Sequence, residues 1–173
     1  MKTIVAVIGG GDPPPEALVI AEEVGRRLAE AGAAVVCGGL SGVMEAVCRG
    51  AHQAGGLTIG ILPTGRWADA NPEVDVVIPT GLGIARNALV VMCGHAVIAV
   101  DGSFGTFSEI AHALELNKPV FALGSWDLAS TGIDPKRYVR VSSPEEAVHL
   151  ALIAARRPPA TQDPFHGRGR REE

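Results

Sequence analysis

Residues 33–62 read AAVVCGGLSGVMEAVCRGAHQAGGLTIGIL, and this stretch decides the fold. Residues 33–37 and 57–62 are short, mostly apolar runs typical of buried strands, whereas residues 43–54 repeat apolar side chains at helical spacing. A glycine turn precedes the helix, and Gly55 and Gly56 follow it. Two apolar strands joined by one helix indicate a parallel pair that is covered on both faces.

The same alternation continues on both sides of this stretch. Upstream, residues 3–8 form an apolar run, and a helical pattern then extends to Ala31 and is closed by Gly32. Ser143 and Glu146 have the spacing of a capping box and start the last helix. Downstream strands are expected at 74–78, 95–100, 120–123 and 138–141, and helices at 84–93 and 105–116.

This order predicts an α/β fold of the Rossmann-like, doubly wound type, with a mainly parallel sheet and helices on both faces. Residues 1–155 are expected to form a single nucleotide-binding domain, and residues 156–173 a flexible tail rich in Pro, Gly and Arg. Ligands of such domains bind at the carboxyl ends of the strands, near the point where the strand order reverses.

Composition excludes several classes of protein. Apolar residues make up 47% of the chain and the net charge is only −4, which excludes a disordered chain. Three cysteines without a CxxC pair exclude a disulfide scaffold, and no cluster of His, Cys, Asp or Glu has the spacing of a metal site. With no membrane-spanning run and no signal peptide expected, the sequence indicates a soluble cytoplasmic protein with reduced thiols.

The charge is unevenly distributed. Residues 1–155 hold ten basic residues against sixteen acidic ones, so their net charge is −6, whereas the tail is basic. An acidic body argues against general nucleic-acid binding, which requires a basic surface. The tail is expected to be a frayed, solvated terminus, with weak binding of nucleic acid or a partner as the alternative.

Three glycine-rich turns, at residues 9–11, 38–42 and 102–106, each join a strand to a helix. In a parallel sheet they lie at one edge, where glycine lets the backbone approach a ligand and the N–H groups of helix starts bind anions. Although tight turns require glycine in any case, three on one edge predict a phosphate-bearing ligand. The ligand-binding residues expected in these turns are Gly10, Gly11, Gly38, Gly39, Ser41, Gly42, Asp101, Gly102, Ser103, Gly105 and Thr106.

Neither GxGxxG with a downstream acid nor GxxxxGK[ST] is present, which argues against an NAD dehydrogenase and a P-loop NTPase.

Arg86 stands in the first turn of the predicted helix 84–93, where a cation opposes the helix dipole. This placement favours a role as a donor to phosphate or carboxylate over an ordinary surface salt bridge. Glu109 is interpreted as a carboxylate that takes part in acid–base chemistry or binds a ribose hydroxyl. The other interpretation is that its negative charge only stabilises the start of the helix through the helix dipole.

Residues 84–93 are apolar on nearly all sides, apart from Arg86 and Asn87. Such a helix is buried on several sides. We therefore expect it in a subunit interface of a homodimer or a dimer-based tetramer.

Several motifs occur in the order seen in the LOG-like family, often labelled lysine decarboxylase-like. They are CGGLSGVMEA (37–46), GILP (60–63), NP (71–72), TGL (80–82), ARN (85–87) and DGSFGTFSEI (101–110). The chain most resembles the short bacterial branch that is similar to the molybdenum cofactor carrier protein, over about residues 3–153. The resemblance implies a Rossmann-like fold, oligomers built on dimers, and a phosphorylated nucleotide-like ligand.

Cytokinin-activating members of that family are phosphoribohydrolases with the signature Pro-Gly-Gly-x-Gly-Thr-x-x-Glu and an upstream Arg-Lys pair. By this resemblance Arg86 and Glu109 occupy the candidate catalytic positions. The chain departs from the pattern at four positions, which are Asn87, Asp101, Ser103 and Ser108. The added carboxylate of Asp101 could repel an anion, or bind a ribose or a pterin amine.

The leading hypothesis is a binding protein for a phosphorylated, nucleotide-like molecule that requires no cofactor of its own, with the molybdenum cofactor as the most specific candidate ligand. The alternative is a nucleoside 5′-monophosphate phosphoribohydrolase, with Arg86 on the substrate and Glu109 stabilising the ribosyl cation or activating water. A nucleotide-sensing scaffold subunit is a third hypothesis.

Overall fold

The computed structural model describes residues 1–128 and 131–156. Within these residues, seven strands form one sheet in the order β4-β3-β2-β1-β5-β6-β7, and every neighbouring pair is parallel. The strands are β1 (Ile4–Gly9), β2 (Ala34–Cys37), β3 (Thr58–Leu62), β4 (Val76–Pro79), β5 (Ala96–Val100), β6 (Val120–Leu123) and β7 (Tyr138–Arg140). The Rossmann-like α/β prediction is confirmed, and all described strands are parallel.

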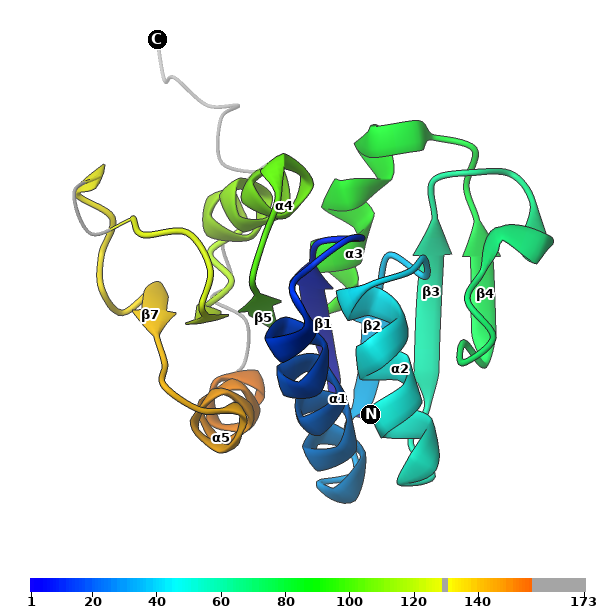
Figure 1. Cartoon of the computed structure of the whole chain (residues 1–173). Coiled ribbons are helices and arrows are strands. Elements are labelled where there is room, and N and C mark those ends of the chain that lie inside the picture. The colour runs from blue at the N-terminus through cyan, green and yellow to red at the C-terminus, as the bar shows by residue number, and fades with distance from the viewer. Residues whose placement is uncertain (129–130, 157–173) are drawn as a thin grey trace, which may run out of the picture.

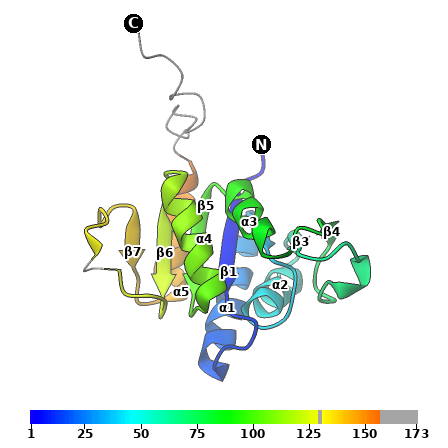
Figure 2. The same cartoon turned by 90° about the horizontal axis from the view of Figure 1, so that it is seen from above.

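Helices cover both faces of the sheet (Figure 1). One layer consists of α1 (Pro15–Glu30), α2 (Val43–Gln53) and α5 (Pro144–Ala155), and the other of α3 (Asn87–Cys93) and α4 (Phe104–Glu115). Figure 2 shows α3 and α4 next to each other. Alternate residues of β1 supply the two cores, since Val5 and Val7 face the first layer whereas Ala6 and Ile8 face the second.

The strand order reverses between β1 and β5. After β1 the chain builds β2, β3 and β4 on one side, and it then returns to place β5 on the other side of β1. The turns that follow β1 and β5 therefore diverge, which opens a crevice at the carboxyl edge of the sheet.

The predicted helix 84–93 is divided in the structure. A 3₁₀ helix, η2 (Gly83–Arg86), precedes α3, so Arg86 ends the first segment rather than lying inside one helix. In the single chain Val90 and Val91 are buried but Ile84 and Met92 are exposed. The burial of this segment on several sides in a subunit interface therefore stays a prediction. A second 3₁₀ helix, η1 (Trp67–Asp69), lies between β3 and β4.

Other element ends differ from the predictions by a few residues. The strand expected at 74–78 is displaced to β4, because Asp75 instead binds Thr58: the Thr58 backbone N–H donates to Asp75 Oδ2 at 2.8 Å. The start of α5 is as predicted, since Ser143 Oγ accepts the N–H of Glu146 at 3.2 Å.

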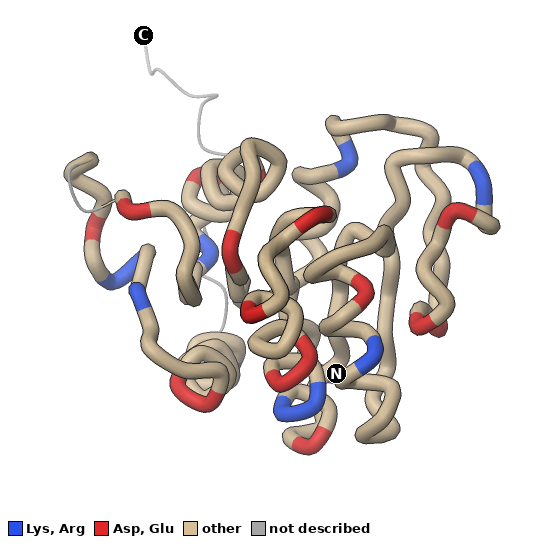
Figure 3. Tube along the Cα trace, viewed as in Figure 1, with Lys and Arg blue, Asp and Glu red and all other residues tan. Residues whose placement is uncertain are grey.

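The predicted tail, apart from Arg156, lies outside the described residues. No helix in the described part of the chain has the length and hydropathy to span a membrane. Figure 3 shows the Lys and Arg positions of that part scattered over several elements rather than gathered in one stripe.

Candidate functional site

The three glycine turns meet at the carboxyl edge of the central strands. The first two are in backbone contact, since the Val43 N–H donates to the Gly10 carbonyl at 3.0 Å. Gly42 has φ +69°, and a Cβ added there would lie 2.4 Å from the Gly10 oxygen. Only glycine permits both this conformation and this close approach.

A cavity of about 280 Å³ lies at this edge. Seven of the predicted site residues line it, namely Gly11, Gly38, Arg86, Ser103, Gly105, Thr106 and Glu109. The other predicted residues lie in the same turns but do not line the cavity, and these are Gly10, Gly39, Ser41, Gly42, Asp101 and Gly102. Whether any of them binds a ligand stays a prediction.

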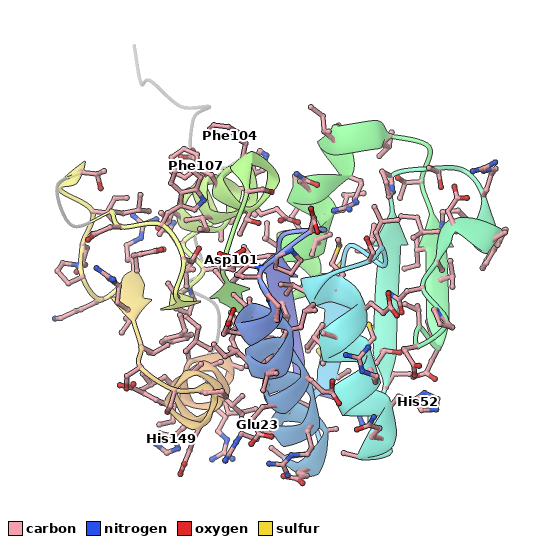
Figure 4. The ribbon with its side chains drawn as sticks, in the orientation of Figure 1. Glu23, His52, Asp101, Phe104, Phe107 and His149 are labelled. Carbon is pink, nitrogen blue, oxygen red and sulfur yellow. The ribbon has the colours of Figure 1, made fainter. Side chains whose placement is uncertain are left out.

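The residues outside the cavity lining have structural contacts of their own. Ser41 Oγ donates to the Gly11 carbonyl at 3.2 Å and so joins the first two turns. Gly39 has φ +72° and faces Leu62 so closely that an added Cβ would lie 2.8 Å away. Asp101 follows β5 with φ +51°, a conformation rare outside glycine, and its side chain lies near Gly10 (Figure 4).

Sequence reasoning missed about half of the cavity lining. The missed residues are Ile8, Gly9, Leu40, Met44, Pro63, Gly83, Ile84 and Asn87. Most are apolar and therefore have no chemical signature in a sequence. Two of them could have been found from the sequence, because Gly83 directly follows the TGL motif and Asn87 directly follows Arg86.

At two glycines of the lining an added Cβ would meet only ordinary van der Waals contacts. An added Cβ would come no closer than 3.8 Å to its nearest neighbour at Gly11 and 3.7 Å at Gly105, and neither residue has a positive φ. Gly38 differs, since an added Cβ would lie 2.5 Å from Arg86 Nη2. Packing within the chain therefore explains glycine at 38 but not at 11 or 105.

Arg86 and Glu109 form a buried ion pair. Arg86 Nη1 lies 3.5 Å from Glu109 Oε1, and each residue is only 6% exposed. Burial raises the pKa of Glu109 to about 7, against the opposing effect of the Arg86 charge. The same burial lowers the pKa of Arg86. The surface salt bridge considered for Arg86 is excluded by this burial.

The guanidinium of Arg86 has further contacts. It donates to Asn87 Oδ1 at 2.9 Å and to the Gly38 carbonyl at 3.4 Å. Its Nε is buried and has no hydrogen-bond partner among the described residues. A buried donor without a hydrogen-bond partner costs free energy. A ligand whose acceptor atom reached this Nε would remove that cost and bind more tightly.

Two of the four departures from the hydrolase pattern contact each other. Asn87 Nδ2 donates to Ser108 Oγ at 3.0 Å, and Ser108 Oγ donates in turn to the Gly105 carbonyl at 2.8 Å. This chain of hydrogen bonds joins α3 to the start of α4, where the Ser103 N–H donates to Thr106 Oγ1 at 3.4 Å. Within the described residues, no three His, Cys, Asp or Glu side chains form a group suited to a metal ion.

Comparison with known proteins identifies the family. The model of the SLOG cluster4 family, within the LOG-like superfamily, matches residues 2–148. The chain belongs to the SLOG cluster4 family. An uncharacterized protein from Archaeoglobus fulgidus is 44% identical over 152 residues, which are 87% of this chain and 95% of that protein.

Solved structures related to this SLOG member include two that bind or carry the molybdenum cofactor. The molybdenum cofactor binding protein of Rippkaea orientalis has a TM-score of 0.82 and 38% identity, over 88% of this chain and 97% of its own. The molybdenum cofactor carrier protein of Chlamydomonas reinhardtii has a TM-score of 0.82 and 34% identity, over 89% and 98% of the two chains.

Proposed function

We propose that this SLOG protein binds a phosphorylated, pterin- or nucleotide-like molecule, and that the molybdenum cofactor is its ligand in a carrier or storage role. The observation that carries the proposal is the cavity at the strand-order reversal, where Gly11 and Gly105 are glycines that close packing within the chain does not require. The structural relatives that bind or carry the molybdenum cofactor support the choice of ligand.

The cavity suits the phosphate end of such a molecule. The first N–H groups of α4 attract an anion, and the absence of side chains at Gly11 and Gly105 lets the phosphate approach the backbone. At about 280 Å³ the cavity lies just below the usual range of ligand pockets, roughly 300–1,000 Å³. The ring system of the ligand would therefore rest at the mouth, beside the exposed residues Ile84 and Ser103.

Arg86 supplies a charge that depends on Glu109. When Glu109 is ionised, the pair is neutral and an incoming phosphate gains little from it. When Glu109 takes up a proton, Arg86 becomes an uncompensated cation beside the cavity, and its unsatisfied Nε can also donate. Phosphate binding is thus coupled to proton uptake by Glu109.

Thermal unfolding with matched ligands tests the proposal. GMP and molybdenum cofactor released from a molybdoenzyme are compared with guanosine and with dephosphorylated molybdopterin. A ligand that binds only the folded state adds about 2.7 kcal/mol at 100 times its dissociation constant. We expect both phosphorylated compounds to stabilise the protein, the cofactor at the lower concentration. Equal stabilisation by the dephosphorylated compounds would refute the phosphate assignment.

Nucleoside 5′-monophosphate phosphoribohydrolase activity is the second candidate, because Glu109 lines the cavity and its pKa of about 7 suits acid–base chemistry at neutral pH. In that reaction water adds to the ribose C1′ as the N-glycosidic bond breaks and the base leaves. Release of free base from a nucleoside monophosphate panel by wild type, lost in Glu109→Gln with binding retained, would establish this activity in place of a carrier role.

A further inference from the structure

A second cavity lies at the amino edge of the sheet, at the opposite ends of the strands from the glycine turns. It has a volume of about 520 Å³, larger than the first. It lies where β5 and β6 begin, beside the last residues of α3 and α4, and α5 contributes Leu150, Ile153 and Ala154. The proposed function does not involve this edge.

The lining of this amino-edge cavity is cationic within an acidic domain. Lys118, Lys136 and Arg137 line it, and no Asp or Glu is found among the described residues of the lining. Lys118 is already engaged, since its Nζ donates to the carbonyl of Met92 at 2.7 Å and to that of Gly94. Lys118 therefore neutralises the end of α3 rather than offering a free charge.

Of the other two cations of the lining, Lys136 is exposed, whereas Arg137 is partly buried. Its backbone is fixed by the sheet, because the Val120 N–H donates to the Arg137 carbonyl at 2.9 Å. Its Nε is buried without a hydrogen-bond partner, and no carboxylate of the described residues forms an ion pair with its guanidinium. A buried donor in this state is stabilised by an anionic acceptor supplied from outside the chain.

The remaining lining is largely apolar. Phe121 and Leu150 form part of it, together with Leu116 and Ile153 from the ends of two helices. We propose that the amino-edge cavity is a second binding site, for a small organic acid with an apolar body, whose carboxylate is held by Arg137. The apolar body of the acid would pack against Phe121 and Leu150, and the planar guanidinium suits a carboxylate.

Methyl NMR of the full chain tests the site with 1-naphthoate as the probe and 1-naphthalenemethanol as its neutral match. We expect naphthoate to shift the methyl resonances of Leu150 and Ile153 but not that of Ile84 at the other edge. The neutral alcohol should bind at least about tenfold more weakly, because it lacks the charge-assisted contact. Unchanged Leu150 and Ile153 resonances at millimolar naphthoate would overturn the proposal.

Two variants and a control assign the contact. Arg137→Gln should weaken naphthoate binding about ten- to a hundredfold while leaving the alcohol unaffected. Arg140→Gln removes an exposed arginine that pairs with Asp127 and does not line the cavity, so it should bind naphthoate as wild type does. Ala154→Phe, which fills the cavity, should abolish binding of both probes. Equal naphthoate affinity in Arg137→Gln and Arg140→Gln would disprove the role of Arg137.

Discussion

Arg86 and Glu109 are two charged side chains that the fold removes from solvent together. Desolvation favours the neutral form of the carboxyl group, and the Arg86 charge offsets only part of this effect, so the pKa of Glu109 remains at about 7. The pair is therefore poised to change its protonation near neutral pH. An isolated sequence cannot reveal this, because the two residues lie on different elements and their burial depends on the packing of α3 against α4.

The raised pKa of Glu109 makes the stability of the protein depend on pH. The folded chain binds more protons than the unfolded chain between pH 4.5 and about 7, so this contribution is complete below pH 4.5 and is lost as pH rises through 7. As pH rises through 7, the loss of this contribution lowers the free energy of unfolding. We expect Glu109→Gln to remove this pH dependence, as measured by denaturant titration at a series of pH values. Glu115→Gln, an exposed change on the same helix, is the control. Parallel pH profiles for wild type and Glu109→Gln would contradict the assignment.

Gly11 and Gly105, where an added Cβ would meet only ordinary contacts, allow effects on ligand binding to be separated from effects on folding. Gly105→Ala adds a methyl group that meets no close neighbour at a position inside α4, so stability should rise by about 0.5 kcal/mol. The same methyl group occupies the ligand cavity and should weaken binding of GMP or the molybdenum cofactor. Thermal unfolding with and without ligand measures both effects.

Gly42→Ala is the matched control for this separation. Its φ of +69° and the 2.4 Å approach to the Gly10 oxygen should make the substitution destabilising by more than about 1 kcal/mol. A Gly105→Ala protein that binds as tightly as wild type would show that the ligand does not approach this turn.

At the scale of elements, the buried strands were the easiest to predict. β1, β2 and β5 are continuous apolar runs because helices cover both of their faces, and such runs end sharply at the glycine turns. The division between η2 and α3 could not be predicted, because residues 84–93 keep their helical spacing through it. Gly83, the first residue of η2, has φ +57°, and the spacing of apolar residues contains no information about this backbone conformation.

The helix caps carry a local signal that the structure preserves. Ser143 caps α5 by accepting the Glu146 N–H, and Ser143→Ala should lower stability by about 1 kcal/mol. Calorimetric unfolding measures the loss, and ligand binding should be unchanged because α5 does not reach the glycine turns. A substitution to Asp at the same position retains the cap and should restore stability. No loss in Ser143→Ala would mean that water replaces the cap without cost.

For the whole molecule, the order of elements predicted a doubly wound, mainly parallel sheet with helices on both faces, since parallel strands joined by helices leave few arrangements. It did not predict the order of the strands. The contacts inside the crevice were less predictable. Residues such as Ile8 and Leu40 line it through the way the turns close on each other, and an apolar side chain has the same sequence signal in a cavity as in the core.

Exposed apolar residues are concentrated on the side of the sheet that carries α3 and α4. They are Val76, Ile78, Leu82, Ile84, Met92, Phe104 and Phe107. Val76 and Ile78 pair in register with Ile59 and Ile61, which pack toward the second core, and Figure 4 shows Phe104 and Phe107 projecting from α4 away from the sheet. Ile84 is 89% and Phe104 83% exposed. A concentration of this kind is typical of protein interfaces.

We therefore expect a homodimer that buries this side of each chain, in keeping with the interface predicted for residues 84–93. Ile84→Arg places a charge in that contact and should convert the dimer to a monomer without unfolding it, because Ile84 makes little contact within its own chain. Light scattering at micromolar concentration measures the mass. Val19→Arg, at a 70% exposed position on α1 in the opposite layer, should leave the dimer intact. A wild-type protein with the mass of a monomer would show that this dimer does not form. Equal disruption of the dimer by Val19→Arg would show that the contact does not lie on the α3 and α4 side.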